Sequence, residues 1–515
     1  MRHRYPWVPA VLLVVCAAAL TWMWGFRDDD RQSNILQTVI WVSSSSILCF
    51  AWFVTLSSFS RRVRLLSLAS VAMTIALGLT FIRVGGVTGD LVPIFTWRFS
   101  TPADAALEPS SPGSSTTTSQ PVAVDVSWRD YPQFLGPDRN GTVAAIDTAR
   151  DWNEKPPRLL WRQPIGAGWS GFAVSGDAAF TQEQRGAEEV VTCYALLTGE
   201  LRWTHTDETR YETVIGGIGP RATPTVDGAD VFAYGATGIL NCIERNTGKS
   251  LWRRDRLKEN GRDAPNEWGM SRSPLDHSDL VIVTFVGSPD RSLVAYDRSS
   301  GEPRWHAGNA SGGYSSPLLT QLAGISQVIV VNHQSIDAHD AQTGAVLWSH
   351  PWPGKFPKVA QPVVVANDQV VVSSGYGVGC ALLKIALQGD GLQVEELWKT
   401  RSLKAKFANF VQRDGFLYGL DDGILVCVDV ATGKRHWKRG RYGHGQMILA
   451  GELLLVAGEH GDVALVEATP AGHRELTRFT AFDHKQWNSP ALAAPYLLVR
   501  TDQEAACYEL TSADS

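Results

Sequence analysis

The chain has few charged residues and few cysteines for its length. Charged side chains make up 19% of the 515 residues and the formal net charge is -5, so no basic field is available to hold a phosphate backbone. The seven cysteines include neither an adjacent pair nor a C-x-x-C-H haem-attachment motif. G-x-S-x-G, P-loop and dinucleotide-binding fingerprints are also absent from the sequence. Nucleic-acid binding and these enzyme classes are therefore disfavoured.

Residues with metal-ligand or catalytic spacing are missing as well. The twelve histidines are scattered, and His333, His339, His444 and His460 show no metal-ligand spacing. The stretch PDRNGT, 137–142, lacks the regular oxygen series of a calcium loop, so a solvated turn is expected there. The sequence thus predicts no catalytic residue and no metal site.

Residues 1–88 differ in kind from the rest and predict a membrane anchor. They contain apolar stretches at 7–24, 35–56 and 65–84, each near the roughly 20 residues that a helix needs to cross a bilayer. Basic residues precede the first stretch and separate the second from the third, which predicts a cytoplasmic N-terminus and puts everything after residue 85 outside the cytoplasm. A signal peptide at 1–25 followed by a buried hairpin is the alternative.

A Ser/Thr/Pro-rich stretch follows the anchor. Residues 89–127 include TPADAALEPSSPGSSTTTSQP, which has no apolar periodicity. Such composition is typical of a flexible, partly extended tether. We expect it to connect the anchor to a domain at 128–511.

One phrase recurs through that domain. Its copies share Thr or Ser before Gly, and Trp four positions after that Gly. Acidic residues such as Asp297, Asp340 and Asp429 can accept hydrogen bonds from the turn, the glycine permits a positive φ, and the tryptophan offers a flat surface to a neighbouring unit. The copies are CYALLTGELRW, CIERNTGKSLW, AYDRSSGEPRW, AHDAQTGAVLW and CVDVATGKRHW, with Gly199, Gly248, Gly301, Gly344 and Gly433 and with Trp203, Trp252, Trp305, Trp348 and Trp437.

The spacing of the phrase predicts an all-β, eight-bladed β-propeller. Tryptophans from Trp161 to Trp437 lie 39 to 53 residues apart, the length of a four-stranded antiparallel blade. The runs between them alternate as hairpins do. The last blade supplies only three strands before the chain ends, and RLLWRQP, 158–164, is the expected fourth, which would close the ring. The blades are expected to begin near Trp169, Thr223, Ser273, Ser316, Gln361, Asn409, Gln446 and Ser489.

The iterated A-x-D-x-x-T-G-x-x-x-W phrase resembles the repeat of the pyrroloquinoline quinone (PQQ) propeller family. The resemblance covers 128–511, and WRDYPQFLGPDRNG, 128–141, is similar to the start of its BamB-like, membrane-tethered members. It implies a membrane-anchored extracytoplasmic scaffold for protein–protein interaction, without a cofactor. It also implies a bacterial cytoplasmic (inner) membrane with the propeller on its periplasmic side. The alternative that it implies is a PQQ-dependent quinoprotein dehydrogenase acting on alcohols or sugars. Such enzymes use calcium, an adjacent cysteine pair and an aspartate base.

The cysteines do not follow that enzyme pattern. Cys193, Cys242, Cys427 and Cys507 each occupy the small position of the repeat. They are therefore expected on different blades, unpaired, as small buried groups.

Long loops from each Trp-ended strand to the next blade predict a binding face at one end of the propeller axis. Aromatic and basic residues there are of the types that dominate binding hot spots. We expect the partner to be another extracytoplasmic or membrane protein, besides the lipid bilayer. The candidate residues are Trp169, Arg221, Trp268, Arg272, Tyr314, Lys358, Lys406, His444 and Trp487.

Overall fold

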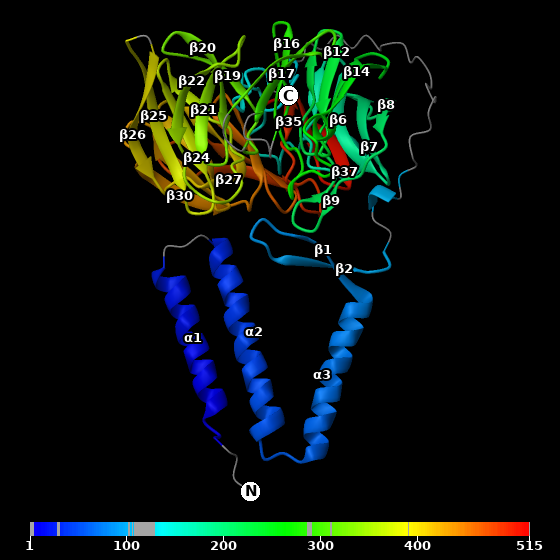
Figure 1. Ribbon diagram of the computed structural model, residues 1–515, viewed down its shortest axis with the longest axis vertical. Helices are drawn as coiled ribbons and strands as arrows, with labels where there is room; N and C mark the ends of the chain where they lie inside the picture. Colours follow the sequence, from blue (N-terminus) through cyan, green and yellow to red (C-terminus); the bar gives the residue numbers. More distant parts are fainter. Residues whose placement is uncertain are drawn as a thin grey trace. The chain divides into compact units, whose positions relative to one another are not determined.

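The chain forms two compact units, residues 1–101 and 102–515 (Figure 1). The computed structural model describes residues 5–27, 31–100, 103–105, 107, 129–285, 291–308, 312–389 and 391–513.

The first unit contains three helices that are long and apolar enough to cross a membrane. They are α1 (Val8–Phe26), α2 (Arg31–Leu56) and α3 (Arg61–Phe81), which confirms the three predicted apolar helices. α3 begins earlier than predicted because its first turn includes Arg61, Arg62 and Arg64, and the Ser60 hydroxyl accepts a hydrogen bond from the Val63 amide. The indole Nε1 of Trp24 donates to Thr38, which links α1 to α2.

A short hairpin follows α3 and was not expected from the sequence. Strand β1 (Ile82–Val87) pairs antiparallel with β2 (Pro93–Trp97). Trp97 stacks on Phe81 at a centroid distance of 5.1 Å. The hairpin contains Gly85 and Gly86, and its strands are largely exposed. The residues that the tether prediction placed at 108–127 lie outside the described residues.

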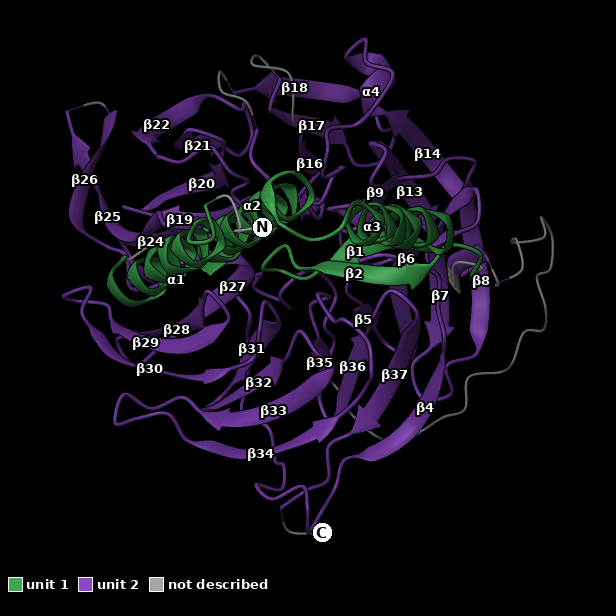
Figure 2. Ribbon diagram, turned by 90° about the horizontal axis from the view of Figure 1, so that it is seen from below, with its two compact units in different colours: residues 1–101 green, residues 102–515 purple. Residues whose placement is uncertain are grey.

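In the second unit, eight sheets built of four-stranded antiparallel meanders are arranged around an axis, which confirms the eight-bladed β-propeller (Figure 2). Strands β9 (Glu212–Thr213) and β10 (Gly217–Ile218) form a further two-stranded sheet in the loop between blades 1 and 2. Blades 1 to 4 are β5–β8 (Ala173–Ser175, Ala178–Arg185, Glu188–Ala195, Leu201–Asp207), β11–β14 (Thr225–Asp227, Asp230–Tyr234, Ile239–Glu244, Ser250–Asp255), β15–β18 (Leu275–His277, Leu280–Thr284, Leu293–Asp297, Pro303–Ala307) and β19–β22 (Leu318–Leu322, Ile325–Val331, Ser335–Asp340, Val346–Pro351). Blades 5 to 7 are β23–β26 (Val363–Ala366, Gln369–Ser374, Gly379–Gln388, Gly391–Thr400), β27–β30 (Ala405–Arg413, Phe416–Asp421, Ile424–Asp429, Arg435–Arg441) and β31–β34 (Gln446–Ala450, Leu453–Ala457, Asp462–Glu467, Glu475–Thr480).

Blade 8 joins the two ends of the domain, as predicted. Strands β35 (Ala491–Ala493), β36 (Tyr496–Arg500) and β37 (Glu504–Glu509) come from the end of the chain. The fourth strand, β4 (Arg158–Pro164), comes from the start of the domain and pairs antiparallel with β37, with Trp161 opposite Cys507. This pairing removes a free sheet edge and closes the ring.

In five blades, a tryptophan of the outer strand packs on the turn of the next blade. At Gly301, where φ is +70°, an added Cβ would lie 2.6 Å from the Trp252 ring of the preceding blade. The Trp252 indole Nε1 also donates to the Arg298 carbonyl of that turn, at 2.8 Å. Asp297 accepts hydrogen bonds from the Ser299 and Ser300 amides and so holds the turn. The same ring-on-glycine contact occurs for Trp161 on Gly199, Trp203 on Gly248, Trp305 on Gly344 and Trp398 on Gly433.

A second set of hydrogen bonds joins adjacent blades near their inner strands. It involves the residue just before the proline with which several of the blades begin. The Thr223 amide donates to the Ser273 hydroxyl, and the Ser273 amide donates to the Ser316 hydroxyl, both at 3.0 Å. In blades 5 and 6, the Gln361 amide donates to Asn409 Oδ1 at 2.9 Å. Adjacent blades are thus joined at both the outer and the inner end.

Residues 131–143, here called the plug segment, contact the inner strands of blades 1, 2, 3 and 7. Tyr131 forms a bridge with Val174 of blade 1, and β3 (Thr142–Val143) adds a parallel fifth strand to blade 7. Arg139 is only 3% exposed and donates to the Ser273 and Pro274 carbonyls of blade 3. The turn expected to be fully solvated at 137–142 therefore contains a buried arginine.

Candidate functional site

The loops that connect each outer strand to the next blade gather on one end of the propeller, here called the loop face. The opposite end, called the turn face, carries the Thr-Gly turns between the third and fourth strands. A cavity of about 140 Å³ lies among the loop-face residues and the plug segment. Its lining residues come from several blades and from Phe134 of the plug segment. Among those from the blades are Trp169, Tyr314, Asn409 and Gln446.

Aromatic rings dominate the cavity. Trp487 lies 5.0 Å from Trp169 and 5.3 Å from Phe407, measured between ring centroids. The aromatic lining also includes Phe134, Trp268, Tyr314 and Tyr376. Since aromatic side chains provide much apolar area at little conformational cost, this lining is suited to binding.

Hydrogen bonds hold the two central tryptophans in place. The Trp169 indole Nε1 donates to the Gly216 carbonyl at 2.8 Å. The Trp487 indole Nε1 donates to Glu459 Oε1 at 3.0 Å, and Glu459 Oε2 accepts from the His444 amide at 2.9 Å. Both indole N–H groups are therefore used, and the ring faces provide the remaining binding surface.

Basic side chains surround the aromatic rings. Among the described residues that line the cavity, Arg221 is charged and there is no Asp or Glu. Lys485 lies 3.9 Å from the Trp487 ring centroid and Lys406 lies 4.9 Å from that of Tyr376. Burial lowers the pKa of Lys485 and lowers that of Lys358 to about 8. Both pKa shifts have the same main cause, which is that the ammonium groups are buried and poorly solvated.

Arg272 is the least satisfied of these cations. It is 1% exposed, its guanidinium lies 5.1 Å from the Tyr314 ring centroid, and its Nε and Nη2 atoms have no hydrogen-bond partner. Burial lowers its pKa to about 10. A buried guanidinium with two nitrogens that lack acceptors is costly, and such groups are often found at functional sites.

The nine predicted residues all belong to this region. Trp169, Arg221, Trp268, Tyr314 and Trp487 line the cavity. Arg272 contacts Tyr314, the Lys358 carbonyl accepts from the Tyr314 amide at 2.7 Å, and His444 lies 5.2 Å from Phe407 between ring centroids. Lys406 packs against Tyr376 and Phe407.

Four further residues were missed. Phe134, Tyr376, Phe407 and Lys485 line or border the cavity. Tyr376 sits in a turn between second and third strands, and Phe134 precedes the first blade, so the loops considered did not include them. Phe407 and Lys485 stand beside predicted residues in the sequence, and their aromatic or basic character was the available signal.

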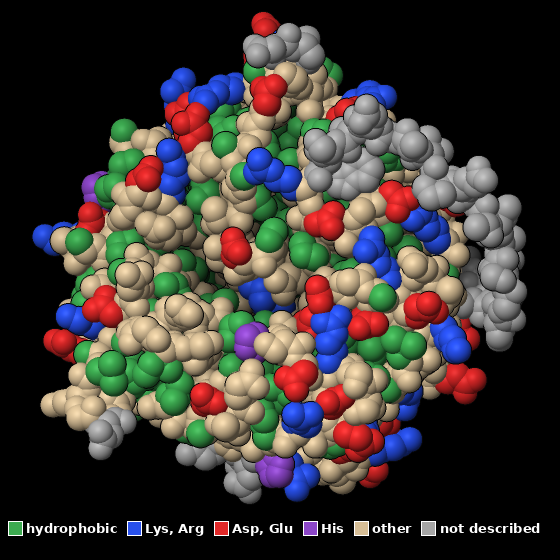
Figure 3. Space-filling view, turned by 90° about the horizontal axis from the view of Figure 1, so that it is seen from above, with side chains coloured by type: hydrophobic (Ala, Val, Ile, Leu, Met, Phe, Trp, Pro, Cys, Tyr) green, Lys and Arg blue, Asp and Glu red, His purple; other side chains and the backbone are tan. Residues whose placement is uncertain are grey.

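A larger hollow of about 970 Å³ lies elsewhere, between residues 129–147 and the end of blade 8. Its described lining contains no aromatic side chain and has both signs of charge, with Arg129 and Arg158 beside Asp130 and Glu509. Figure 3 shows one face of the propeller, hollowed near its centre, with Lys and Arg interspersed with Asp and Glu. The smaller aromatic cavity is the better candidate for a binding site.

Comparison with known families agrees with this fold. The family described as outer membrane protein assembly factor BamB matches residues 139–261 and 187–439, together more than half of the chain. The chain belongs to the BamB family. Its relatives include BamB of Shewanella oneidensis, 22% identical over 351 residues that cover 65% of this chain and 84% of that protein. BamB of Yersinia pestis is 23% identical over 348 residues, which cover 63% and 82%.

Solved structures show the same propeller fold. The crystal structure of BamB from Moraxella catarrhalis superimposes with a TM-score of 0.50 at 17% identity, covering 68% of this chain and 97% of that one. Quinohemoprotein alcohol dehydrogenase from Comamonas testosteroni has a TM-score of 0.53 at 12% identity, covering 74% and 80%. At these identities the likeness concerns the fold alone.

The residues of this BamB-family chain do not fit the quinoprotein pattern. Cys193, Cys242, Cys380, Cys427 and Cys507 are all buried and free. Within the described part of the chain, no group of three or more His, Cys, Asp and Glu is placed to hold a metal. The lining of the aromatic cavity also offers no carboxylate to serve as a base.

Proposed function

We propose that this protein is a membrane-anchored scaffold that binds another extracytoplasmic or membrane protein through the aromatic cavity of its loop face. The observation that carries the proposal is a cavity lined by Trp169, Trp268, Trp487 and Arg221, with no carboxylate among its described lining residues. Trp, Tyr and Arg are the residue types that most often dominate binding hot spots. Membership of the BamB family, whose name refers to outer membrane protein assembly, supports the same class of function.

The charges indicate what kind of segment would bind. Arg221, Lys485 and the unsatisfied Arg272 favour a partner segment with a carboxylate. The aromatic walls favour an apolar or aromatic residue beside it. We infer an acidic segment with a large apolar residue.

The membrane arrangement belongs to the same proposal. α1, α2 and α3 would anchor the chain, and the basic residues around Arg61 would remain in the cytoplasm by the positive-inside rule. The propeller would then lie on the periplasmic side of the cytoplasmic membrane, within reach of partners in transit to the outer membrane.

A pulldown from intact membranes tests the proposal. We expect a Trp169→Ala, Trp487→Ala double variant to lose the partner that the wild type retains. Leu251→Ala is the matched control, because Leu251 is 51% exposed on β14, away from the cavity. Circular dichroism checks that each variant is folded. Retention of the same partner by the double variant would contradict the proposal.

Adding PQQ and calcium to the purified chain tests the enzymatic alternative. The proposal predicts neither a quinone absorbance nor dye reduction with alcohols or sugars. Substrate-dependent dye reduction would favour the dehydrogenase.

A further inference from the structure

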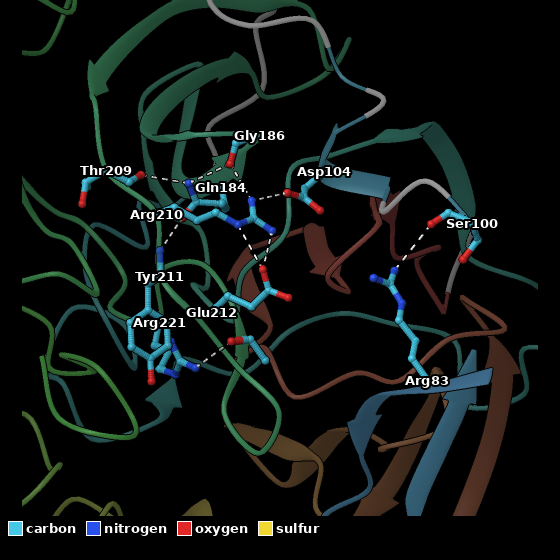
Figure 4. Close-up of polar contacts among 11 residues, drawn as sticks. Arg83, Ser100, Asp104, Gln184, Gly186, Thr209, Arg210, Tyr211, Glu212 and Arg221 are labelled. Carbon is cyan, nitrogen blue, oxygen red and sulfur yellow. Dashed lines mark hydrogen bonds and ion pairs between the residues drawn. The ribbon is translucent and has the colours of Figure 1, made fainter. Parts of the chain in front are cut away.

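A short segment that precedes the propeller in the sequence is bound to blade 1. The 3-10 helix η1 (Ala103–Ala105) places Asp104, which is only 1% exposed, against the turn between β6 and β7. The Gly186 amide donates to the Asp104 carbonyl at 3.2 Å. Asp104 Oδ2 accepts from Arg210 Nη1 at 2.7 Å (Figure 4).

Arg210 connects several groups at this place. Besides Asp104, it donates to the Gly186 carbonyl, and its Nη2 donates to Glu212 Oε2 at 2.8 Å. One guanidinium thus holds η1, the β6–β7 turn and the loop that follows β8. Because charged hydrogen bonds in partly buried places are stronger than exposed ones, this arrangement specifies a docked position for η1.

The same loop forms one wall of the aromatic cavity. The Tyr211 amide donates to Gln184 Oε1 at 3.2 Å, and the Arg221 guanidinium lies 4.4 Å from the Tyr211 ring centroid. Arg221 Nη2 and the Trp169 indole Nε1 both donate to the Gly216 carbonyl. A continuous set of contacts therefore runs from Asp104 through residues 208–221 to Trp169.

We propose that residues 103–105 are a latch that docks on Arg210 and Gly186 and holds residues 208–221, the cavity wall, in its binding shape. Undocking of the latch removes one of the three acceptors of Arg210 and loosens this loop. The segment between the anchor and the propeller then regulates the cavity as well as connecting to it. The docking stands independently of the proposed function, whereas its effect on binding rests on it.

Hydrogen exchange on the full chain in detergent micelles tests the latch without any partner. In Asp104→Ala, we expect the Gly186 amide to exchange roughly tenfold faster, the size of effect expected for loss of a charged hydrogen bond. Peptides covering 208–221 should also exchange faster. Asp177→Asn is the matched control, because it removes the ion pair with Arg202 on the same blade, at 2.6 Å, without touching this loop.

Each outcome decides a part of the proposal. Unchanged Gly186 exchange in Asp104→Ala would overturn the docking. Faster Gly186 exchange with unchanged 208–221 exchange would overturn the coupling to the cavity wall. Arg210→Gln should reproduce the effect, and the double variant should exceed neither single variant by more than about twofold, since both remove the same interaction. A failed pulldown in the partner experiment would leave these exchange results unaffected.

Discussion

The turn face and the loop face of the propeller both use tryptophan side chains, but in different kinds of contact. On the turn face, Trp252 packs on Gly301 and donates to the carbonyl of the next turn, and the same contact recurs from blade to blade. On the loop face, Trp169 and Trp487 pack against each other between blades 1 and 8 and line the aromatic cavity, a contact outside the blade-to-blade series. We assign the repeated tryptophan contacts to stability and, as proposed above, the aromatic cavity to binding.

The largest expected effect separates the two kinds of tryptophan. Trp252→Ala should lower the free energy of unfolding by about 3–5 kcal/mol, because a buried ring between two blades is lost. Trp268→Ala, half-buried at the cavity, should cost less than about 1 kcal/mol. Urea denaturation of the full chain in micelles, followed by circular dichroism, measures both. Equal losses would abolish the distinction between the faces.

A pair of glycines sharpens the account of the turn face. Gly301 and Gly324 have φ of +70° and +76°, but only at Gly301 would a Cβ meet a tryptophan. Gly324→Ala should cost about 1 kcal/mol for the backbone conformation alone, and Gly301→Ala about 1–3 kcal/mol more for the clash with Trp252. The same denaturation assay compares them. Indistinguishable midpoints would show that the turn is not held against the ring.

On the loop face, a buried cation should matter for binding and little for folding. Arg272→Met removes a guanidinium whose Nε and Nη2 have no acceptor, so the free energy of unfolding should change by less than about 1 kcal/mol or should rise. Partner recovery in the membrane pulldown should fall. A strongly destabilised variant would instead assign Arg272 a structural role like that of Arg139.

The smallest effect is a pH dependence. Because burial lowers the pKa of Lys358 from 10.5 to about 8, the unfolded chain binds more protons at this group between those values. The Lys358 contribution therefore makes the protein more stable as pH rises from about 8 to 10.5. Subtracting the pH profile of Lys358→Met from that of the wild type isolates this contribution. A difference that is flat or falls over this range would contradict the buried position of the amine.

The repeat predicted most of the fold because its information is local. The turn phrase and the spacing of tryptophans predicted eight blades, and the unpaired RLLWRQP predicted the closure by β4. The plug segment was not predicted, because Arg139 binds the carbonyls of Ser273 and Pro274, which lie far from it in the sequence. The local sequence PDRNGT does not predict that contact.

The prediction of candidate site residues extended only to the loops that connect each outer strand to the next blade. Trp487 and Trp169 were named as candidates because they stand in loops that follow outer strands. Tyr376 comes from a turn between the second and third strands of blade 5, and Phe134 reaches the cavity from the plug segment, so their places depend on the closed ring. The latch at Asp104 also depends on tertiary contact, since the composition around it indicates only a tether.

Site-specific photocrosslinking in living cells tests the central claim, that the loop face binds the partner. p-Benzoylphenylalanine is placed at Trp268 in the cavity or at Lys249, an exposed residue in a turn of the turn face. We expect a discrete protein adduct from position 268 and none from position 249. An adduct from position 249 alone would contradict the account and move the binding surface to the opposite end of the propeller.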